Sequence, residues 1–309
     1  MKNNLLYQWM FLIVFTTACS SPQTRTLQIA DNIMKSKSDP DLAEVFSLAT
    51  GFKENDFSAA RLKKYSDAGI DRLYSSLFRI AFFFPEQEKY ISFQGNVLEE
   101  KLRRGKRVNY DLERMHKAYI GARKFEKAVI LGNRFPDVKF QRVPSVILDN
   151  SAGETAWRAY DISDGAEKAM LKALPMGTGL KVVMEIFTGC SAAETAMDQI
   201  LIDPVLSALF KKYGVLLTSR FDAEGILLWR NHFNFPEVYI AYKATDFPGF
   251  DFESSPNFYF LKDGKIKFSF SGWSNSNDPN YGPNNMRKGF EAISLDQHPE
   301  MVGKNWTDF

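Results

Sequence analysis

Apolar residues recur at helical spacing through the first half of the chain. From Asp41 to about Phe135 they repeat with the period of helices that bury one face. The first amphipathic stretch begins at Leu42. The later ones cover residues 73–84, where Pro85 ends the helix, 97–102 and 112–131. The region 41–136 is therefore predicted to be an all-α domain.

The last of these stretches has a spacing similar to a tetratricopeptide repeat. Tyr119, Phe125 and Ala128 match that spacing, and Gly121 lies near the expected turn. Stacked repeats need about three units to bury their faces, and the sequence offers one convincing helical pair. A plain helical layer is therefore the favoured interpretation, and packing or contact is its expected use.

After Pro136 the pattern changes to short β-rich runs separated by turn residues. Val143 to Leu148 is rich in β-branched residues and Trp157 to Ile162 alternates apolar and polar positions, so the two are predicted to form a hairpin. The elements expected next are a helix at 166–174, a buried strand at 180–187, a helix at 191–213 with a kink at Pro204, a strand at 215–221, a helical piece at 226–233 and a strand at 238–242.

The clearest local signal lies near the C-terminus. Asn257–Leu261 and Lys265–Phe270 are aromatic-rich strands joined through Asp263-Gly264, which is a strong hairpin signal. Strands and helices that alternate and end in a hairpin and one last helix indicate an α/β layered domain. We place this domain at 137–295, with a C-terminal tail at 296–309.

The first nineteen residues differ in kind from the rest. Lys2 precedes an almost wholly apolar run from Leu5 to Phe15, and small residues then lead to Cys19. The run is too short to cross a bilayer comfortably as a helix. The segment resembles a bacterial lipoprotein signal, which implies that residues 1–18 are removed and that Cys19 carries a lipid.

The residues around Cys19 refine this expectation. Ser20 resembles the outer-membrane sorting signal of Gram-negative lipoproteins, which implies a lipid-anchored protein of the cell envelope that faces the periplasm. Thr16 stands where lipoprotein signals usually have Leu, so cleavage by the ordinary signal peptidase is the alternative. The polar segment 19–40 is expected to be a linker between the lipid and the folded protein.

Composition narrows the classes of partner and cofactor. The chain has 309 residues and a formal net charge of +2, with acidic and basic residues interspersed, which gives no electrostatic reason to expect nucleic acid. We interpret the basic run Lys101–Arg107 as a solvated helix end. The histidines, His116, His232 and His298, lie far apart, and neither a metal nor a cofactor is expected.

Three segments of the second half resemble the thioredoxin superfamily. Ser255 to Ile266, followed by Gly272-Trp273, is similar to the closing hairpin of thioredoxins, which implies that Pro256 is their cis-proline. The strand from Val182 into Cys190 is similar to their active-site strand, turn and helix. Val143 to Gly153 is similar to the opening hairpin of membrane-anchored thioredoxin-like reductases and peroxiredoxins. The resemblance covers nearly all of 141–295 and implies a central mixed sheet flanked by helices.

The resemblance also identifies candidate site residues. Pro256 is implied to face the reactive Cys190, and Glu185 is implied to be the buried acid that relays protons to it. The alternative for Glu185 is a strand-edge acid that faces solvent. The chain reads Cys190-Ser191-Ala192-Ala193 where thioredoxins have a second cysteine at the position of Ala193, so the resolving thiol is absent. Only Thr188 is similar to the residues that precede a peroxiredoxin cysteine, and it is one place out of register.

Two functions remain open from the sequence. If Cys190 begins a helix, unpaired N–H groups and the helix dipole favour its thiolate, which would make it a monothiol redox site. Otherwise Cys190 is vestigial and the fold serves as a scaffold for interaction. The expected partners are the membrane, through the lipid on Cys19, and envelope proteins that bear thiols or bind the helical domain.

Overall fold

The computed structural model describes residues 22–35, 42–150, 153, 157–274 and 278–293. The predicted signal segment, Cys19, His298 and the tail at 296–309 lie outside the described residues. Within them, no helix has both the length and the apolar character needed to span a membrane.

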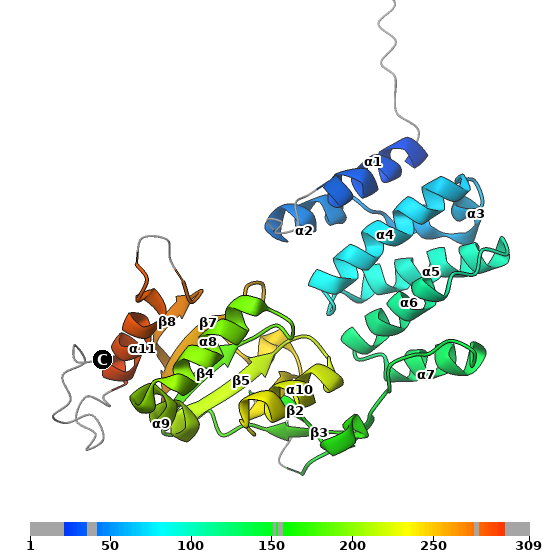
Figure 1. Cartoon of the computed structure of the whole chain (residues 1–309). Helices are drawn as coiled ribbons and strands as arrows, with labels where there is room; N and C mark the ends of the chain where they lie inside the picture. The colour runs from blue at the N-terminus through cyan, green and yellow to red at the C-terminus, as the bar shows by residue number, and fades with distance from the viewer. Residues whose placement is uncertain (1–21, 36–41, 151–152, 154–156, 275–277, 294–309) are drawn as a thin grey trace, which may run out of the picture.

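Helices make up the first part of the described chain, as predicted (Figure 1). They are α1 (Pro22–Lys35), α2 (Leu42–Thr50), α3 (Ala59–Leu62), α4 (Asp67–Phe83), α5 (Glu88–Arg103), α6 (Asn109–Gly121) and α7 (Phe125–Arg134), with a 3-10 turn at Glu54–Phe57. Ser66 caps α4, because its hydroxyl accepts a hydrogen bond from the Gly69 N–H at 3.1 Å. The stretch at 112–131, with its expected turn near Gly121, forms the two helices α6 and α7, and in the turn between them Arg123 has a left-handed φ of 57°.

The segment expected to be a linker contains a packed helix. Helix α1 buries Thr26, Ala30 and Ile33 against its neighbours, chiefly α4. Arg72 of α4 pairs with Asp31 of α1 at 3.0 Å. The linker prediction was therefore wrong for Pro22–Lys35. Few large apolar residues are needed here, since a narrow stripe of small side chains is enough for a helix that packs on one neighbour.

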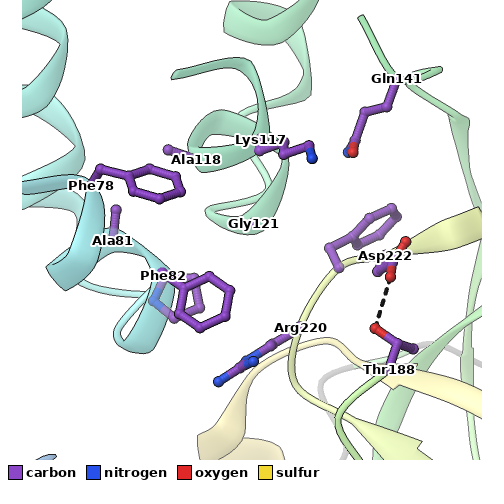
Figure 2. A pocket seen from close by; sticks show the side chains of 12 residues that line it. Phe78, Ala81, Phe82, Lys117, Ala118, Gly121, Gln141, Thr188, Arg220 and Asp222 are labelled. Carbon is purple, nitrogen blue, oxygen red and sulfur yellow. Dashed lines mark hydrogen bonds between the residues drawn. The ribbon is translucent and has the colours of Figure 1, made fainter. Parts of the chain in front are cut away.

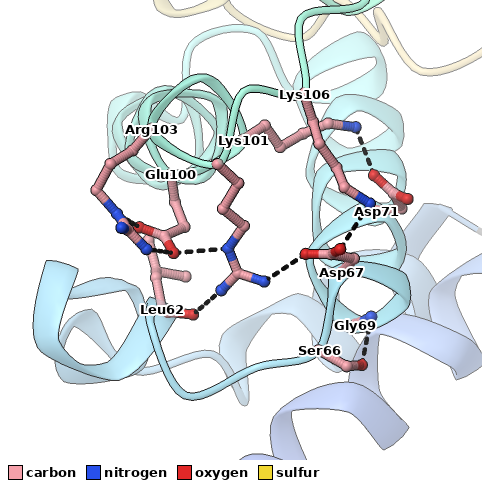
Figure 3. A network of polar contacts seen from close by, with 10 residues as sticks. Leu62, Ser66, Asp67, Gly69, Asp71, Glu100, Lys101, Arg103 and Lys106 are labelled. Carbon is pink, nitrogen blue, oxygen red and sulfur yellow. Dashed lines mark hydrogen bonds and ion pairs between the residues drawn. The ribbon is translucent and has the colours of Figure 1, made fainter.

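The basic run 101–107 covers the C-terminal end of α5, where Arg103, Lys106 and Arg107 are exposed as expected, but Lys101 is buried in a network of ion pairs (Figure 3). The Lys101 side chain is only 6% exposed, and its Nζ lies 2.6 Å from Asp71 Oδ1 and 2.6 Å from Asp111 Oδ2. Lys101 therefore ties α5 to both α4 and α6.

Glu100 is the second centre of that network. Its carboxylate is 4% exposed and accepts hydrogen bonds from Arg103 Nε at 2.7 Å and from Arg104 Nε at 2.7 Å. Arg104 continues to Asp67 of α4 at 2.8 Å. The hydrogen bonds from the two guanidinium groups lower the pKa of Glu100 to about 2, and the bond from Arg103 has the largest effect.

The second part of the chain forms one mixed sheet, ordered β1-β3-β2-β6-β5-β4-β7-β8. The strands are β1 (Ser145–Leu148), β2 (Arg158–Ile162), β3 (Lys168–Ala173), β4 (Leu180–Glu185), β5 (Gly214–Thr218), β6 (Val238–Ala241), β7 (Asn257–Lys262) and β8 (Lys265–Ser271). Strands β4, β5 and β6 are parallel neighbours, whereas β7 pairs antiparallel to β4 and β8 pairs antiparallel to β7. The Asp263-Gly264 turn joins β7 to β8 as predicted, with left-handed φ values of 49° and 73°.

Two predictions at the start of the sheet were wrong. Residues 166–174 form strand β3 and not a helix, and the 145–148 and 158–162 strands do not pair with each other. Strand β3 lies between them, parallel to β1 and antiparallel to β2. Lys168-Ala-Met-Leu-Lys-Ala173 consists of good helix formers, but its alternation places Ala169 and Leu171 on the buried face, so the pairing with two strands outweighs the local preference.

Helices α8 (Ser191–Ile202), α9 (Pro204–Tyr213), α10 (Ala223–Phe233) and α11 (Tyr281–Ala292) share the hydrophobic core on one face of the sheet. The other face packs against aromatic residues of the segment 244–252, which follows β6. The predicted kink at Pro204 is a complete break, because Asp203 ends α8 and caps α9 through hydrogen bonds to two backbone N–H groups at 2.9 Å. Trp229, Phe233 and Phe235 belong to the core, as expected.

Helices α6 and α7 connect the helical layer to the sheet. Ile120 and Ala128 belong to the same core as the sheet residues, and the Phe125 ring lies 4.9 Å from the Phe221 ring. Arg123 Nη2 donates to the carbonyl oxygens of Ser219 at 2.6 Å and Ala241 at 2.9 Å. The loops after β5 and β6 are therefore fixed directly to the α6–α7 turn.

Candidate functional site

The candidate site begins where β4 ends. The chain turns through Gly189, whose φ is +82°, and Cys190 then takes the N-cap position of α8. The Cys190 N–H donates to the Phe187 carbonyl at 3.0 Å, and the Cys190 carbonyl accepts from the Glu194 N–H at 3.0 Å. The thiol is half-buried and makes no capping hydrogen bond to the first N–H groups of α8.

The loop before β7 lies against this turn. The Cys190 Sγ is 3.6 Å from the Ser255 carbonyl oxygen, and the Phe187 N–H donates to the Ser255 hydroxyl at 2.9 Å. The Ser255–Pro256 peptide bond is cis. Segments that are 65 residues apart in sequence therefore meet at Cys190, through the carbonyl of the residue that precedes Pro256.

The side chain of Asn257 holds that loop in place through hydrogen bonds. It is 1% exposed, and its Nδ2 donates to the carbonyls of Asp251 and Ser254, each at 2.9 Å. Asn257 also pairs with Glu185 in the register of β7 on β4. The geometry around Cys190 is therefore built on the neighbouring strands β4 and β7.

Glu185 is the last residue of β4, next to the site, and is completely buried. Neither carboxylate oxygen has a hydrogen-bond partner among the described residues. Burial raises the pKa of Glu185 well above its ordinary value, and the nearby charge of Arg220 opposes the rise. The alternative of a solvent-facing strand-edge acid is therefore wrong.

Arg220 is a member of the site that the sequence did not identify. Its guanidinium carbon lies 3.7 Å from the centre of the Phe187 ring and 4.2 Å from that of Phe82, which comes from the helical layer. Burial lowers the pKa of Arg220 to about 10, while the charges of Glu185 and Cys190 oppose this shift. A lone arginine after a strand carries no sequence signal, because its placement depends on two rings from distant segments.

The other side chains near the cysteine limit what the site can do. Ala193 is fully buried, so the position of a second thiol is occupied by a methyl group. Thr188 donates to Asp222 Oδ2 at 2.7 Å and is directed away from the thiol. In the described part of the chain, no cluster of three acidic, histidine or cysteine side chains could hold a metal ion.

The described histidines are His116 and His232, and His232 lines a pocket that includes Gly189 of the Cys190 turn. His116 is buried, stacks on Phe140 with ring centres 4.6 Å apart, and has its pKa lowered by burial to about 4. His232 packs edge-on against Phe233 on α10. Neither forms a pair with Cys190 that could act in nucleophilic catalysis.

Comparison with known proteins adds little to this geometry. No family model matches the chain, and no curated protein matches it at a significant level. A thioredoxin-like protein from Bacteroides caccae ATCC 43185 is similar in structure, with 14% identity, coverage of 93% of this chain and 99% of that chain, and a TM-score of 0.27. The fold is α/β, with a mixed eight-stranded sheet that follows an all-α region.

Proposed function

We propose that the protein is an exported thioredoxin-fold lipoprotein that uses Cys190 as a single redox thiol. In the reaction, the Cys190 thiolate attacks one sulfur of a partner's disulfide. A new sulfur–sulfur bond forms, and the partner's other sulfur leaves as a thiolate and takes up a proton. Because Ala193 offers no second thiol, a thiol from another molecule must release Cys190 from the mixed disulfide.

The position of the Cys190 Sγ carries this proposal. The sulfur is half-buried at the start of α8, 3.6 Å from the Ser255 carbonyl, in a turn that also adjoins Arg220. Free N–H groups at a helix start and a nearby guanidinium both stabilise a thiolate.

The rate of thiol alkylation tests the proposal. The protein is prepared without its first nineteen residues, so that Cys190 is the one cysteine left of the two in the chain. At pH 7 we expect iodoacetamide to modify Cys190 at least tenfold faster in the folded protein than in 6 M guanidinium. A matched control places a cysteine one turn further along α8, as Thr195→Cys in a Cys190→Ser background. If Cys190 reacts no faster than this exposed control, the activated thiolate does not exist.

The membrane tether is a separate part of the proposal. It rests on the sequence from Lys2 to Cys19, which resembles a lipoprotein signal. We expect a palmitate analogue supplied to the producing bacterium to label the full chain, and we expect Cys19→Ala to abolish the label. A mature protein that begins after Cys19 and carries no lipid would support the ordinary signal peptidase instead. The domain at 137–295 then carries the redox site, and the helices before it lie nearer the membrane.

A second candidate is a membrane-tethered interaction module. The buried methyl group of Ala193 favours it, because an ordinary dithiol cycle is closed to this site. In that case a Cys190→Ser strain behaves as the wild type while a strain that lacks the whole chain is defective. The monothiol proposal expects both strains to be defective.

A further inference from the structure

A cavity of about 340 Å³ lies between the helical layer and the sheet domain (Figure 2). Helices α4 and α6 form one side, and the loops after β4 and β5 form the other. Its volume is at the lower end of the range for small-molecule sites, which is about 300–1,000 Å³. It adjoins the Cys190 turn through Thr188, but Cys190 does not line it.

The helical side of the cavity is apolar. Phe78, Ala81, Phe82 and Pro85 come from α4 and the turn that follows it, and Ala118 comes from α6. Phe82 is 47% exposed, which is unusual for a phenylalanine at the contact between two layers. This wall suits an aromatic ring or a branched aliphatic group.

The remaining sides carry two cations that form no ion pair with a described residue, although Arg220 lies near the buried Glu185. Arg220 is held between Phe82 and Phe187, and its guanidinium forms no ion pair or hydrogen bond with any described residue. Lys117 is exposed on α6 and likewise forms no ion pair with a described residue. A partly desolvated guanidinium with no partner gains most from a carboxylate, which accepts two parallel N–H bonds.

The acid in the cavity does not neutralise them. Asp222 Oδ2 accepts from the Thr188 hydroxyl at 2.7 Å, and Asp222 Oδ1 accepts from the Gly225 N–H at 3.0 Å. Asp222 therefore serves as the N-cap of α10, where the helix start offsets its charge. The cavity thus presents an apolar wall and an excess of positive charge.

We propose that this cavity binds a compact apolar carboxylic acid, with its ring or branched group against Phe78 and Ala81 and its carboxylate at Arg220 and Lys117. Such a group occurs in free aromatic acids and in the C-terminal residue of a peptide that ends in an apolar side chain. The proposed ligand shares Arg220 with the redox site but needs no thiol.

Calorimetric titration of the folded protein tests the site. The probes are 3-phenylpropanoate, N-acetyl-Ala-Ala-Phe with a free C-terminus, and each molecule as its uncharged amide. We expect an acid to bind at least about tenfold more tightly than its amide, because a charge-assisted hydrogen bond is lost. Binding of the peptide acid indicates a peptide C-terminus as the source, and binding of phenylpropanoate alone indicates a free acid.

Variants separate this site from other causes of binding. Arg220→Met and Lys117→Met should each weaken the acid about tenfold and leave the amide unchanged, whereas Lys211→Met on α9 should bind as the wild type. Lys117 is exposed, so its variant tests the site even if Arg220→Met fails to fold. Cys190→Ser should bind normally, which distinguishes this proposal from the redox one. Equal affinity for acid and amide, no binding of either acid, or full affinity in Lys117→Met would overturn the proposal.

Discussion

Replacement of the buried acid under Cys190 should stabilise the protein. The Glu185 carboxyl is fully buried, and neither of its oxygens has a hydrogen-bond partner among the described residues. An unsatisfied buried polar group costs about 1–3 kcal/mol even when it is neutral. Glu185→Met keeps the length of the side chain and removes that cost, so we expect the free energy of unfolding to rise by about 1–3 kcal/mol at pH 5.

The gain should grow with pH. Burial raises the pKa of Glu185 above its ordinary value of 4.5, so the folded protein holds this proton more tightly than the unfolded chain does. The stability linked to that proton is fully present below pH 4.5 and is lost as the pH rises through the raised folded value. The methionine variant lacks this loss. Its advantage over the wild type should therefore be larger at pH 8 than at pH 5.

Urea unfolding at pH 5 and pH 8, followed by tryptophan fluorescence, measures both effects. The variants are made in a Cys190→Ala background, so that titration of the thiol does not contribute. Glu185→Gln is the matched control, because it removes the ionisation but keeps a polar group, so its gain should be confined to high pH. The reasoning fails if Glu185→Met destabilises the protein at both values, or if its advantage is the same at pH 5 and pH 8.

Three further substitutions test how the layers are held. Arg123→Met removes the hydrogen bonds to the loops after β5 and β6, and should lower the free energy of unfolding by about 2–4 kcal/mol and speed proteolytic cleavage between the layers. Glu100→Gln should lower the free energy of unfolding by about 1–2 kcal/mol at pH 7, after allowance for screening. Because the pKa of Glu100 in the folded protein is lowered to about 2, this difference from the wild type in urea unfolding should vanish as the pH falls from 4.5 towards 2. Gly289→Ala would place a methyl carbon 2.3 Å from the Phe260 ring and should lower the melting temperature, with a cost of about 1–3 kcal/mol. The control Gly132→Ala on α7, whose nearest neighbour is 3.8 Å away, should match or exceed the wild type.

Local chemistry explains which elements were predictable. Pro204 lacks an N–H, and Asp203 before it is a good cap, so the break between α8 and α9 follows from adjacent residues. The Asp263-Gly264 turn depends only on residues that tolerate a positive φ. In contrast, 168–173 has helix-forming residues and becomes a strand because two other strands lie on either side of it.

The candidate site divides in the same way. The sequence features that indicated it were Cys190 before a helix and Ser255-Pro256 before a hairpin. These segments do meet, through the Cys190 Sγ and the Ser255 carbonyl. Glu185 was left open between two interpretations, because a strand acid is buried or exposed according to what covers the sheet. Arg220 and the positive charge in the cavity were missed, since they depend on a ring from α4 and on Asp222 being used as a helix cap.

By itself, the sequence determined the division into helical and α/β parts, the hairpin turn and the position of Cys190 at a helix start, because each depends on neighbours along the chain. The tertiary structure decided the strand order, the burial of Glu185, the packing of α1 on α4 and the cavity between the layers. These features depend on contacts between residues that are far apart in sequence. The free energy of such contacts comes from desolvation and packing, which no local pattern records.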